Sequence, residues 1–277
     1  MEVPLTKYVR AHDLDSWIRD PRIAERGFAH RWQSSVASGN GEDAFIALVE
    51  QHLQPDYDVL DLGCGHGEFT LTLATRCRSI VGIEREPGYL DLAKELAAEQ
   101  NITNAQFFQV NLAGFKDGDR VFAGIPLAED SIDLFVDRRG PILQRYLIEA
   151  IRVARSNAVI VGLHPAGNTP SPPWRDDLPK LYRKVFMALS FDEVTRWVID
   201  PLRTAGISDY SLWWLDVPEF LRTPYELYLR LGAALSSDVP EYQNVEPQLT
   251  KIFKQHSTSQ GIVLRHQRLL WQAYVPK

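Results

Sequence analysis

One stretch of the sequence decides the fold, namely Val59-Leu-Asp-Leu-Gly-Cys-Gly-His-Gly67. Its apolar start predicts a buried strand, its alternate glycines predict a tight turn, and the residues after Gly67 predict a helix. Glycine permits such a turn and lets the backbone approach a ligand without a Cβ in the way. This order of strand, turn and helix predicts a binding site for a nucleotide-like ligand.

The chain around this stretch alternates between strand and helix patterns. Apolar runs predict strands at residues 57–62, 79–84, 106–110, 132–136 and 158–163. Helical spacing predicts helices at residues 41–53, 69–76, 90–100 and 142–154. Strands that alternate with helices at this spacing predict a parallel sheet covered by helices on both faces.

The last third of the chain departs from this alternation. Residues 164–173 are rich in Pro and Gly and predict a loop. Ser190 followed by Glu193 then predicts a capped helix that ends near Gly206. Strand patterns at residues 210–215 and 262–274 flank a mostly helical segment.

Two acidic residues distinguish between ligands of the glycine turn. A dinucleotide fingerprint needs its third glycine one residue later, where this chain has Glu68. Asp61 places a negative charge beside the turn, which repels a pyrophosphate and suits a cationic ligand. Glu84 ends the second strand 21 residues after Gly63, where a carboxylate accepts hydrogen bonds from both ribose hydroxyls. These features fit S-adenosylmethionine, which carries ammonium and sulfonium charges.

Residues 57 to 163 resemble a class I S-adenosylmethionine-dependent methyltransferase. The stretch from Asp61 to Gly67 is similar to the first motif of that family, and Glu84 is similar to its acidic second motif. The resemblance implies an α/β, Rossmann-like, seven-stranded and mostly parallel sheet whose last strand is antiparallel. It also implies S-adenosylmethionine as cofactor and S-adenosylhomocysteine as product.

The resemblance implies a role for each motif position. Asp61 and the turn would hold the methionyl end of the cofactor, and Glu84 would bind the ribose. Asn111 occupies the position where the family commonly has an Asp that meets the adenine amino group, and its carbonyl still accepts that bond. The full set of cofactor-binding candidates is Asp61, Gly63, Cys64, Gly65, Gly67, Glu84, Arg85, Asn111 and Leu112.

Candidate catalytic residues follow the fourth and fifth strands. Asp137 ends the fourth strand, where the methyl group would point, and could accept a proton or orient a nucleophile. The neighbouring Arg138 and Arg139 could grip a carboxylate or phosphate. His164 ends the fifth strand and has a side chain suited to base catalysis near neutrality. Each of these residues could instead be an ordinary packed or solvated side chain.

The fourth-strand motif Asp133-Leu-Phe-Val-Asp-Arg-Arg-Gly-Pro141 argues against two methyltransferase subclasses. It is not the Asn/Asp-Pro-Pro-Tyr/Phe signature of enzymes that methylate amino groups. It also contains no Pro-Cys pair to supply the nucleophile for methylation at carbon 5 of a pyrimidine. The two cysteines, Cys64 and Cys77, have no metal-ligand spacing around them, so we expect no metal site.

Charge and composition bear on the substrate. The chain has 277 residues, 45% hydrophobic residues and a net charge of −6, which argues against broad nucleic-acid binding. Residues 138–196 nevertheless carry ten Lys or Arg against five Asp or Glu. We therefore expect a small-molecule substrate that accepts the methyl group on O, N or S, with RNA as the alternative. A non-catalytic protein that binds the cofactor is a further alternative, and a nicotinamide-dependent oxidoreductase fits the glycine spacing poorly.

The predicted organisation is a single methyltransferase domain over residues 1–277. It comprises a helical lid at 1–40, a Rossmann-like core at 41–215 and 259–277, and a helical insertion at 216–258. The apolar face of the insertion is typical of a cap over a small-molecule pocket, and equally of any packed helix. No apolar run approaches a membrane-spanning length and the N-terminus has no signal region, so we expect a cytoplasmic protein without membrane contact. The sequence does not indicate an oligomeric state.

Overall fold

The computed structural model describes residues 42–112, 114–116, 119–121, 124–138, 143, 146–168, 170–186, 190–232 and 239–276. The helical lid predicted at residues 1–40 lies outside these residues, as does Arg139. Within the described part of the chain, no helix is both long and apolar enough to cross a membrane.

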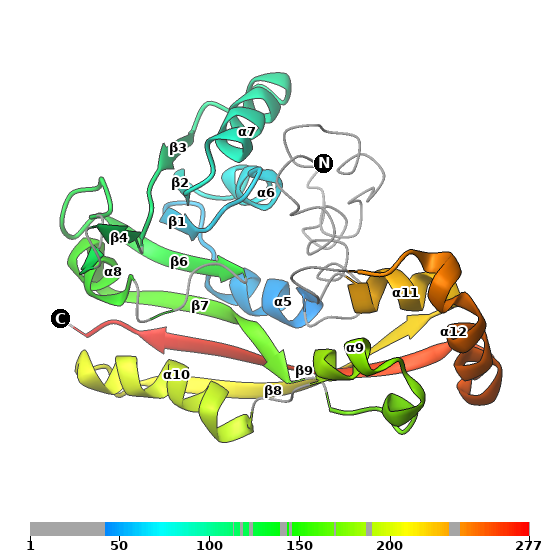
Figure 1. Ribbon diagram of the computed structural model, residues 1–277. Coiled ribbons are helices and arrows are strands. Elements are labelled where there is room, and N and C mark those ends of the chain that lie inside the picture. Colours follow the sequence, from blue (N-terminus) through cyan, green and yellow to red (C-terminus); the bar gives the residue numbers. More distant parts are fainter. Residues whose placement is uncertain are drawn as a thin grey trace.

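A seven-stranded sheet forms the centre of the molecule, in the order β3-β2-β1-β6-β7-β9-β8. β1 pairs in parallel with β2 and with β6, whereas β9 is antiparallel to both β7 and β8. The predicted fold class, with an antiparallel last strand, is confirmed (Figure 1). The strands are β1 (Asp58–Leu62), β2 (Ser79–Glu84), β3 (Ala105–Gln109), β6 (Ile132–Arg138), β7 (Ala154–Asn168), β8 (Tyr210–Leu221) and β9 (Ile262–Tyr274).

Helices cover both faces of this sheet with separate apolar clusters. One cluster joins α5 and α6 to the sheet residues Val59, Leu134 and Val136. The other joins α8 and α10 to Leu60 and Phe135, the neighbours of those residues along the strands. Successive residues of β1 and β6 therefore point to opposite faces, as the pleat requires. The helices are α5 (Glu42–His52), α6 (Glu68–Ala74), α7 (Pro87–Glu99), α8 (Leu147–Val153) and α10 (Phe191–Thr204).

Most predicted elements occur, but several bounds differ. β2 and β9 have the predicted limits, whereas α8 begins at Leu147 instead of residue 142. β7 continues to Asn168, into the predicted loop, because Gly167 and Asn168 still pair with β9. β8 continues to Leu221, so the helical prediction for residues 216–221 is wrong: these residues pair with β9 without interruption. A short hairpin of β4 (Gly114–Lys116) and β5 (Asp119–Val121) was not predicted.

The start and end of α10 follow the sequence signals. The Ser190 hydroxyl accepts a hydrogen bond from the Glu193 N–H at 3.1 Å, and the Glu193 carboxylate accepts one from the Ser190 N–H at 3.0 Å. This is the predicted capping box. Gly206 lies two residues after the helix with a φ of 77°, which terminates it as predicted.

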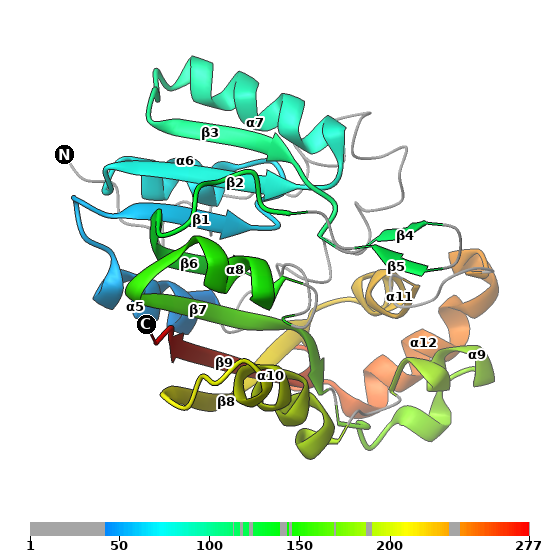
Figure 2. The ribbon, with the colours of Figure 1, turned by 90° about the vertical axis from the view of Figure 1, so that its left-hand side faces the viewer.

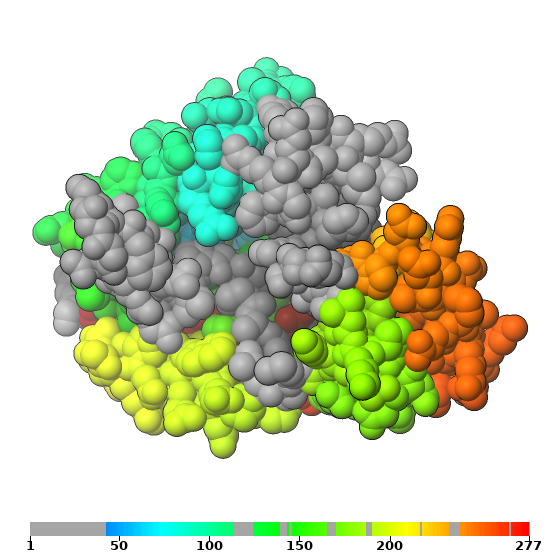
Figure 3. Space-filling model, viewed as in Figure 1, coloured from blue at the N-terminus to red at the C-terminus, as the bar shows by residue number. Residues whose placement is uncertain are grey.

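A third apolar cluster forms a cap beyond β8 and β9. It unites α9 (Lys180–Arg183), α11 (Pro224–Gly232) and α12 (Tyr242–His256) with Phe186 of the short 3-10 helix Lys184–Phe186. Trp174 and Leu178, which flank the 3-10 helix Arg175–Asp177, also belong to it. The cap helices lie on the side toward which β1, β2 and β3 point (Figure 2). Residues 170–186 lie directly beside α12 in the space-filling view (Figure 3), and the Gln248 amide donates to the Asp177 carbonyl at 2.7 Å.

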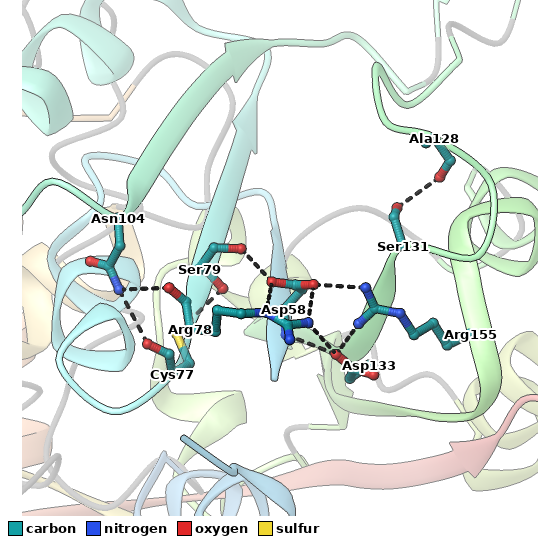
Figure 4. Close-up of polar contacts among 9 residues, drawn as sticks. All are labelled: Asp58, Cys77, Arg78, Ser79, Asn104, Ala128, Ser131, Asp133 and Arg155. Carbon is teal, nitrogen blue, oxygen red and sulfur yellow. Dashed lines mark hydrogen bonds and ion pairs between the residues drawn. The ribbon is translucent and has the colours of Figure 1, made fainter. Parts of the chain in front are cut away.

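An ionic network joins the amino-terminal ends of the four central strands, β2, β1, β6 and β7 (Figure 4). The Asp58 carboxylate accepts hydrogen bonds from Arg78 at 2.5 and 2.9 Å, Ser79 at 2.6 Å and Arg155 at 2.8 Å. The Asp133 carboxylate accepts a hydrogen bond from the Asp58 N–H at 2.8 Å and forms an ion pair with Arg155. The bonds to Arg78 above all hold the pKa of Asp58 below its ordinary value. The network fixes the starts of β1, β2, β6 and β7 relative to one another.

We predict that Asp58→Asn lowers the free energy of unfolding by about 1.5–3 kcal/mol at neutral pH, because it removes hydrogen bonds to a charged group. Since the pKa of Asp58 is lower in the folded state, this contribution is present above the ordinary Asp pKa and is lost as the pH falls below it. Urea denaturation at several pH values measures both effects. Asp56→Asn, at an exposed site two residues away, is the control. Equal stability losses in the two variants would contradict the role of the network.

Candidate cofactor and active site

The carboxyl ends of β1, β2 and β6 meet at one edge of the sheet. Asp61 of β1 lies opposite Gly82 of β2 and Val136 of β6. The ends of these strands therefore bring the glycine turn, Glu84 and Arg138 to the same edge. In open α/β sheets, ligands bind at this edge.

The glycine turn has a backbone conformation that other residues rarely adopt. Gly63, Gly65 and Gly67 have φ angles of 76°, 57° and 82°. A Cβ on Gly67 would lie 2.7 Å from the Ala93 Cβ, so this position also needs glycine for packing against α7. A Cβ on Gly65 would meet no atom of the described residues within 4 Å. Among these residues the turn thus leaves open space above Gly65, which fits a ligand lying against the backbone.

Glu84 connects the turn to the end of β2. Its carboxylate accepts hydrogen bonds from the N–H groups of Gly65 at 3.1 Å, Arg85 at 2.8 Å and Glu86 at 3.1 Å. Each carboxylate oxygen can accept more than one hydrogen bond, so acceptor capacity remains for a ribose. The ribose-binding role expected for Glu84 stays a prediction.

Asp61 lies beneath the turn and not on its surface. Its side chain is only 2% exposed, and it accepts a hydrogen bond from the Thr70 hydroxyl of α6 at 2.6 Å. Burial raises the pKa of Asp61 to about 6, although Thr70 and the positive charge of Arg138 act in the opposite direction. A buried carboxylate here makes the site favourable for positive charge.

Neither cysteine is suited to act as a nucleophile. Cys64 is buried in the turn, where a Cβ on Gly82 would lie 2.8 Å from its sulfur. Burial raises the pKa of the Cys64 thiol well above its ordinary value. Burial raises the pKa of Cys77 to about 12, and this residue precedes β2 at the opposite edge of the sheet. Nucleophilic cysteines need a lowered pKa.

The candidates for the adenine pocket follow β2 and β3. The Val110 N–H donates to the Glu84 carbonyl at 2.9 Å, and the Gln109 amide donates to the Arg85 carbonyl at 3.1 Å. These bonds bring Arg85 and Asn111 to neighbouring positions, and Asn111 is exposed. Leu112 differs, because its side chain is buried in the core cluster with α8 and α10.

The catalytic candidates divide between the two faces of the sheet. Asp137 accepts a hydrogen bond from the buried Tyr146 hydroxyl at 2.5 Å, on the face covered by α8 and α10. His164 lies on this face as well, with its ring centroid 5.8 Å from that of Trp197 in α10. Arg138 lies on the other face, with its guanidinium 4.9 Å from the centre of the Phe69 ring. The structure therefore separates the Arg138 side chain from that of Asp137.

Sequence reasoning did not find Phe69, Thr70 or Tyr146. Phe69 and Thr70 occupy ordinary helical positions, and only the pairing of α6 with the end of β1 reveals their contacts. Tyr146 follows Asp137 by nine residues at the N-cap of α8, where no motif distinguishes it. Among the described residues, no group of three or more His, Cys, Asp or Glu side chains could hold a metal ion.

A family model described as "Methyltransferase domain" matches residues 53–200. The chain belongs to this methyltransferase family. The prediction of a class I S-adenosylmethionine-dependent methyltransferase, and of its cofactor, is thereby confirmed.

The curated relatives share a limited part of this chain. A 23S rRNA (uracil(1939)-C(5))-methyltransferase RlmD of Klebsiella pneumoniae is 48% identical over 66 residues, which cover 24% of this chain and 15% of that protein. The protein of the same name from Aeromonas hydrophila is 33% identical over 124 residues, which cover 43% of this chain and 27% of that protein. The methyltransferase chain thus spans only about a quarter or less of these relatives.

Solved structures agree with the fold over most of the chain. The YcgJ protein of Bacillus subtilis has a TM-score of 0.55 and 15% identity, and covers 85% of this chain and 99% of its own. A putative methyltransferase of Bacillus halodurans has a TM-score of 0.55 and 13% identity, and covers 84% and 99%. At this identity the likeness concerns the fold alone.

We predict that Gly65→Ala weakens binding of S-adenosylhomocysteine by at least tenfold, because its methyl group would enter the open space above the turn. Gly206→Ala is the matched control, since Gly206 also has a positive φ, of 77°, and open space around its Cβ position, but lies after α10. Both variants should lose about 1–2 kcal/mol of stability from the left-handed backbone. Calorimetry measures the affinities, and an unchanged affinity of Gly65→Ala would place the ligand elsewhere.

We predict that Asp61→Asn changes the pH dependence of stability. Asp61 binds its proton more tightly in the folded state, with a pKa of about 6 against an ordinary 3.8, so its contribution to stability falls as the pH rises from about 4 to 6. The variant lacks this loss, which amounts to at most about 3 kcal/mol. Urea denaturation across this pH range tests it, and parallel curves for the variant and the wild type would contradict the assignment.

Proposed function

We propose that the chain transfers the methyl group of S-adenosylmethionine to an O, N or S atom of a small molecule. The nucleophile forms a bond to the methyl carbon as the carbon–sulfur bond breaks, the electron pair stays on sulfur, and the acceptor loses its proton. The cofactor supplies an already activated methyl group, so the protein chiefly orients the reactants and excludes water. The observation that carries this proposal is the open glycine turn tied to the Glu84 carboxylate.

The proposed cofactor contacts follow the geometry of the turn. Asp61 and the turn residues Gly63, Cys64, Gly65 and Gly67 would hold the methionyl end, with Cys64 contributing backbone only because its thiol is buried. Glu84 would accept the ribose hydroxyls. Arg85, Asn111 and Leu112 would flank the adenine, and Leu112 would do so through its backbone because its side chain lies in the core.

Asp137 is the proposed proton acceptor. Its carboxylate lies at the carboxyl end of β6, and the Tyr146 hydroxyl donates to one oxygen at 2.5 Å. This hydrogen bond fixes the orientation of the Asp137 carboxylate at the end of the strand. His164, also buried on this face, is the second candidate.

The state of the cysteines supports a heteroatom acceptor. Carbon 5 of uracil is a poor nucleophile until a thiolate adds to the ring, and this chain has only two cysteines. Both thiols have raised pKa values, and neither lies in an environment that would activate it. The chemistry named for the curated relatives therefore does not transfer to these residues.

The cap supports a small acceptor. Its helices form their own apolar cluster and lie on the side of the sheet toward which β1, β2 and β3 point (Figure 2). Small-molecule sites are typically enclosed, and a cap on this side of the sheet would enclose a small acceptor. The names of the relatives, together with the basic excess of residues 138–196, favour RNA as the second candidate.

A transfer assay with labelled S-adenosylmethionine tests the proposal and distinguishes the two acceptors. We predict that label enters the small-molecule fraction of a cell extract and not purified RNA, and that added salt has little effect. Transfer to RNA that disappears as salt rises would contradict the small-molecule proposal, because binding to phosphates weakens steeply with salt. Binding of the cofactor without transfer to either fraction would favour a non-catalytic protein.

Glu84→Gln tests the proposed role of Glu84 in binding the cofactor. We predict a 10- to 100-fold weaker affinity for S-adenosylmethionine, as expected for the loss of hydrogen bonds to a charged group. Glu149→Gln is the control, because Glu149 also accepts a backbone N–H, that of Ile125 at 2.8 Å, but lies on α8. Equal affinities of the two variants would remove Glu84 from the site.

A further inference from the structure

Two opposite charges lie on the same face of the sheet beside the glycine turn. Asp61 is paired with Val136, and Arg138 follows Val136 by two residues. Residues two apart in a strand share a face. The side chains of Asp61 and Arg138 are therefore diagonal neighbours on the face covered by α6, and the charge of Arg138 acts on Asp61.

Phe69 holds the Arg138 side chain in this position. The guanidinium carbon lies 4.9 Å from the centre of the Phe69 ring. Phe69 is 2% exposed and lies two residues after Gly67, at the start of α6. A cation over a buried aromatic ring is attracted to its face, which restricts the guanidinium to one region. Arg138 remains partly exposed.

The pleat of β6 separates the side chain of Arg138 from that of Asp137, the candidate proton acceptor on the same strand. Asp137 points to the opposite face, where it accepts a hydrogen bond from the Tyr146 hydroxyl. Arg138 instead shares its face with Asp61 and Thr70, the pair beneath the turn. Its guanidinium can donate two parallel hydrogen bonds to a carboxylate, a geometry that Lys or Gln cannot reproduce.

We infer that Arg138, positioned by Phe69, binds the α-carboxylate of the amino-acid part of the cofactor. Asp61 supplies the negative charge that the adjacent α-ammonium group requires. Arg138 is then a cofactor-binding residue, and the pair of charges selects a zwitterionic amino acid. This inference rests on the proposed function, because it assumes that the methionyl end lies on the glycine turn.

Removal of the carboxylate from the ligand tests the inference. The probes are S-adenosylhomocysteine and its decarboxylated analogue, which keeps the amine, each titrated calorimetrically into the full chain. We expect Arg138→Gln to weaken the affinity for S-adenosylhomocysteine about 10- to 100-fold and the affinity for the analogue less than twofold. Arg138→Lys should lose an intermediate amount of affinity for S-adenosylhomocysteine, because Lys keeps the charge without the paired donors. Arg196→Gln, on the exposed side of α10, is the control and should change neither affinity.

Each other outcome overturns a defined part of the account. If Arg138→Gln weakened the affinities for both ligands equally, Arg138 would stabilise the fold or contact the adenosine part of the ligand. That result would overturn this inference alone. An unchanged affinity for S-adenosylhomocysteine in both Arg138 variants would do the same. If the wild-type chain bound neither ligand, the proposed function would fail and this inference would fail with it.

Discussion

The position of the site depends on the parallel pairing of β1 with β2 on one side and β6 on the other. This pairing brings three strand ends to one edge, so that the turn after β1 meets Glu84 of β2 and Arg138 of β6. The ionic network around Asp58 fixes the same strands at their opposite ends. Register at one edge therefore determines which side chains can meet at the other.

Backbone conformation and charged side chains make separate contributions at this edge. The three glycines allow the chain to turn and leave space above Gly65. The Glu84 carboxylate holds the turn by accepting a hydrogen bond from the Gly65 N–H, and the buried Asp61 makes the region favourable for positive charge. Tyr146 and Phe69 then hold Asp137 and Arg138 on opposite faces of one strand. The cofactor and the acceptor can thus be handled by neighbouring residues without direct competition.

The sequence predicted those parts of the structure that local signals determine. The limits of β2 and the capping box of Ser190 and Glu193 are local, and the structure has both. The extension of β8 to Leu221 could not be predicted, because it depends on pairing with β9 some forty residues away. The partners of the site residues were missed for the same reason. Nothing local to Asp137 indicates Tyr146, and only the strand register shows that Arg138 faces Asp61.

The central claim is that the glycine turn and Glu84 bind an adenosyl amino acid and not a dinucleotide. Calorimetric titration of the folded chain with S-adenosylmethionine, S-adenosylhomocysteine and NAD tests it most directly. We expect saturable binding of the first two ligands at one site and no binding of NAD. Failure of both adenosyl ligands to bind, or binding of NAD in their place, would contradict it.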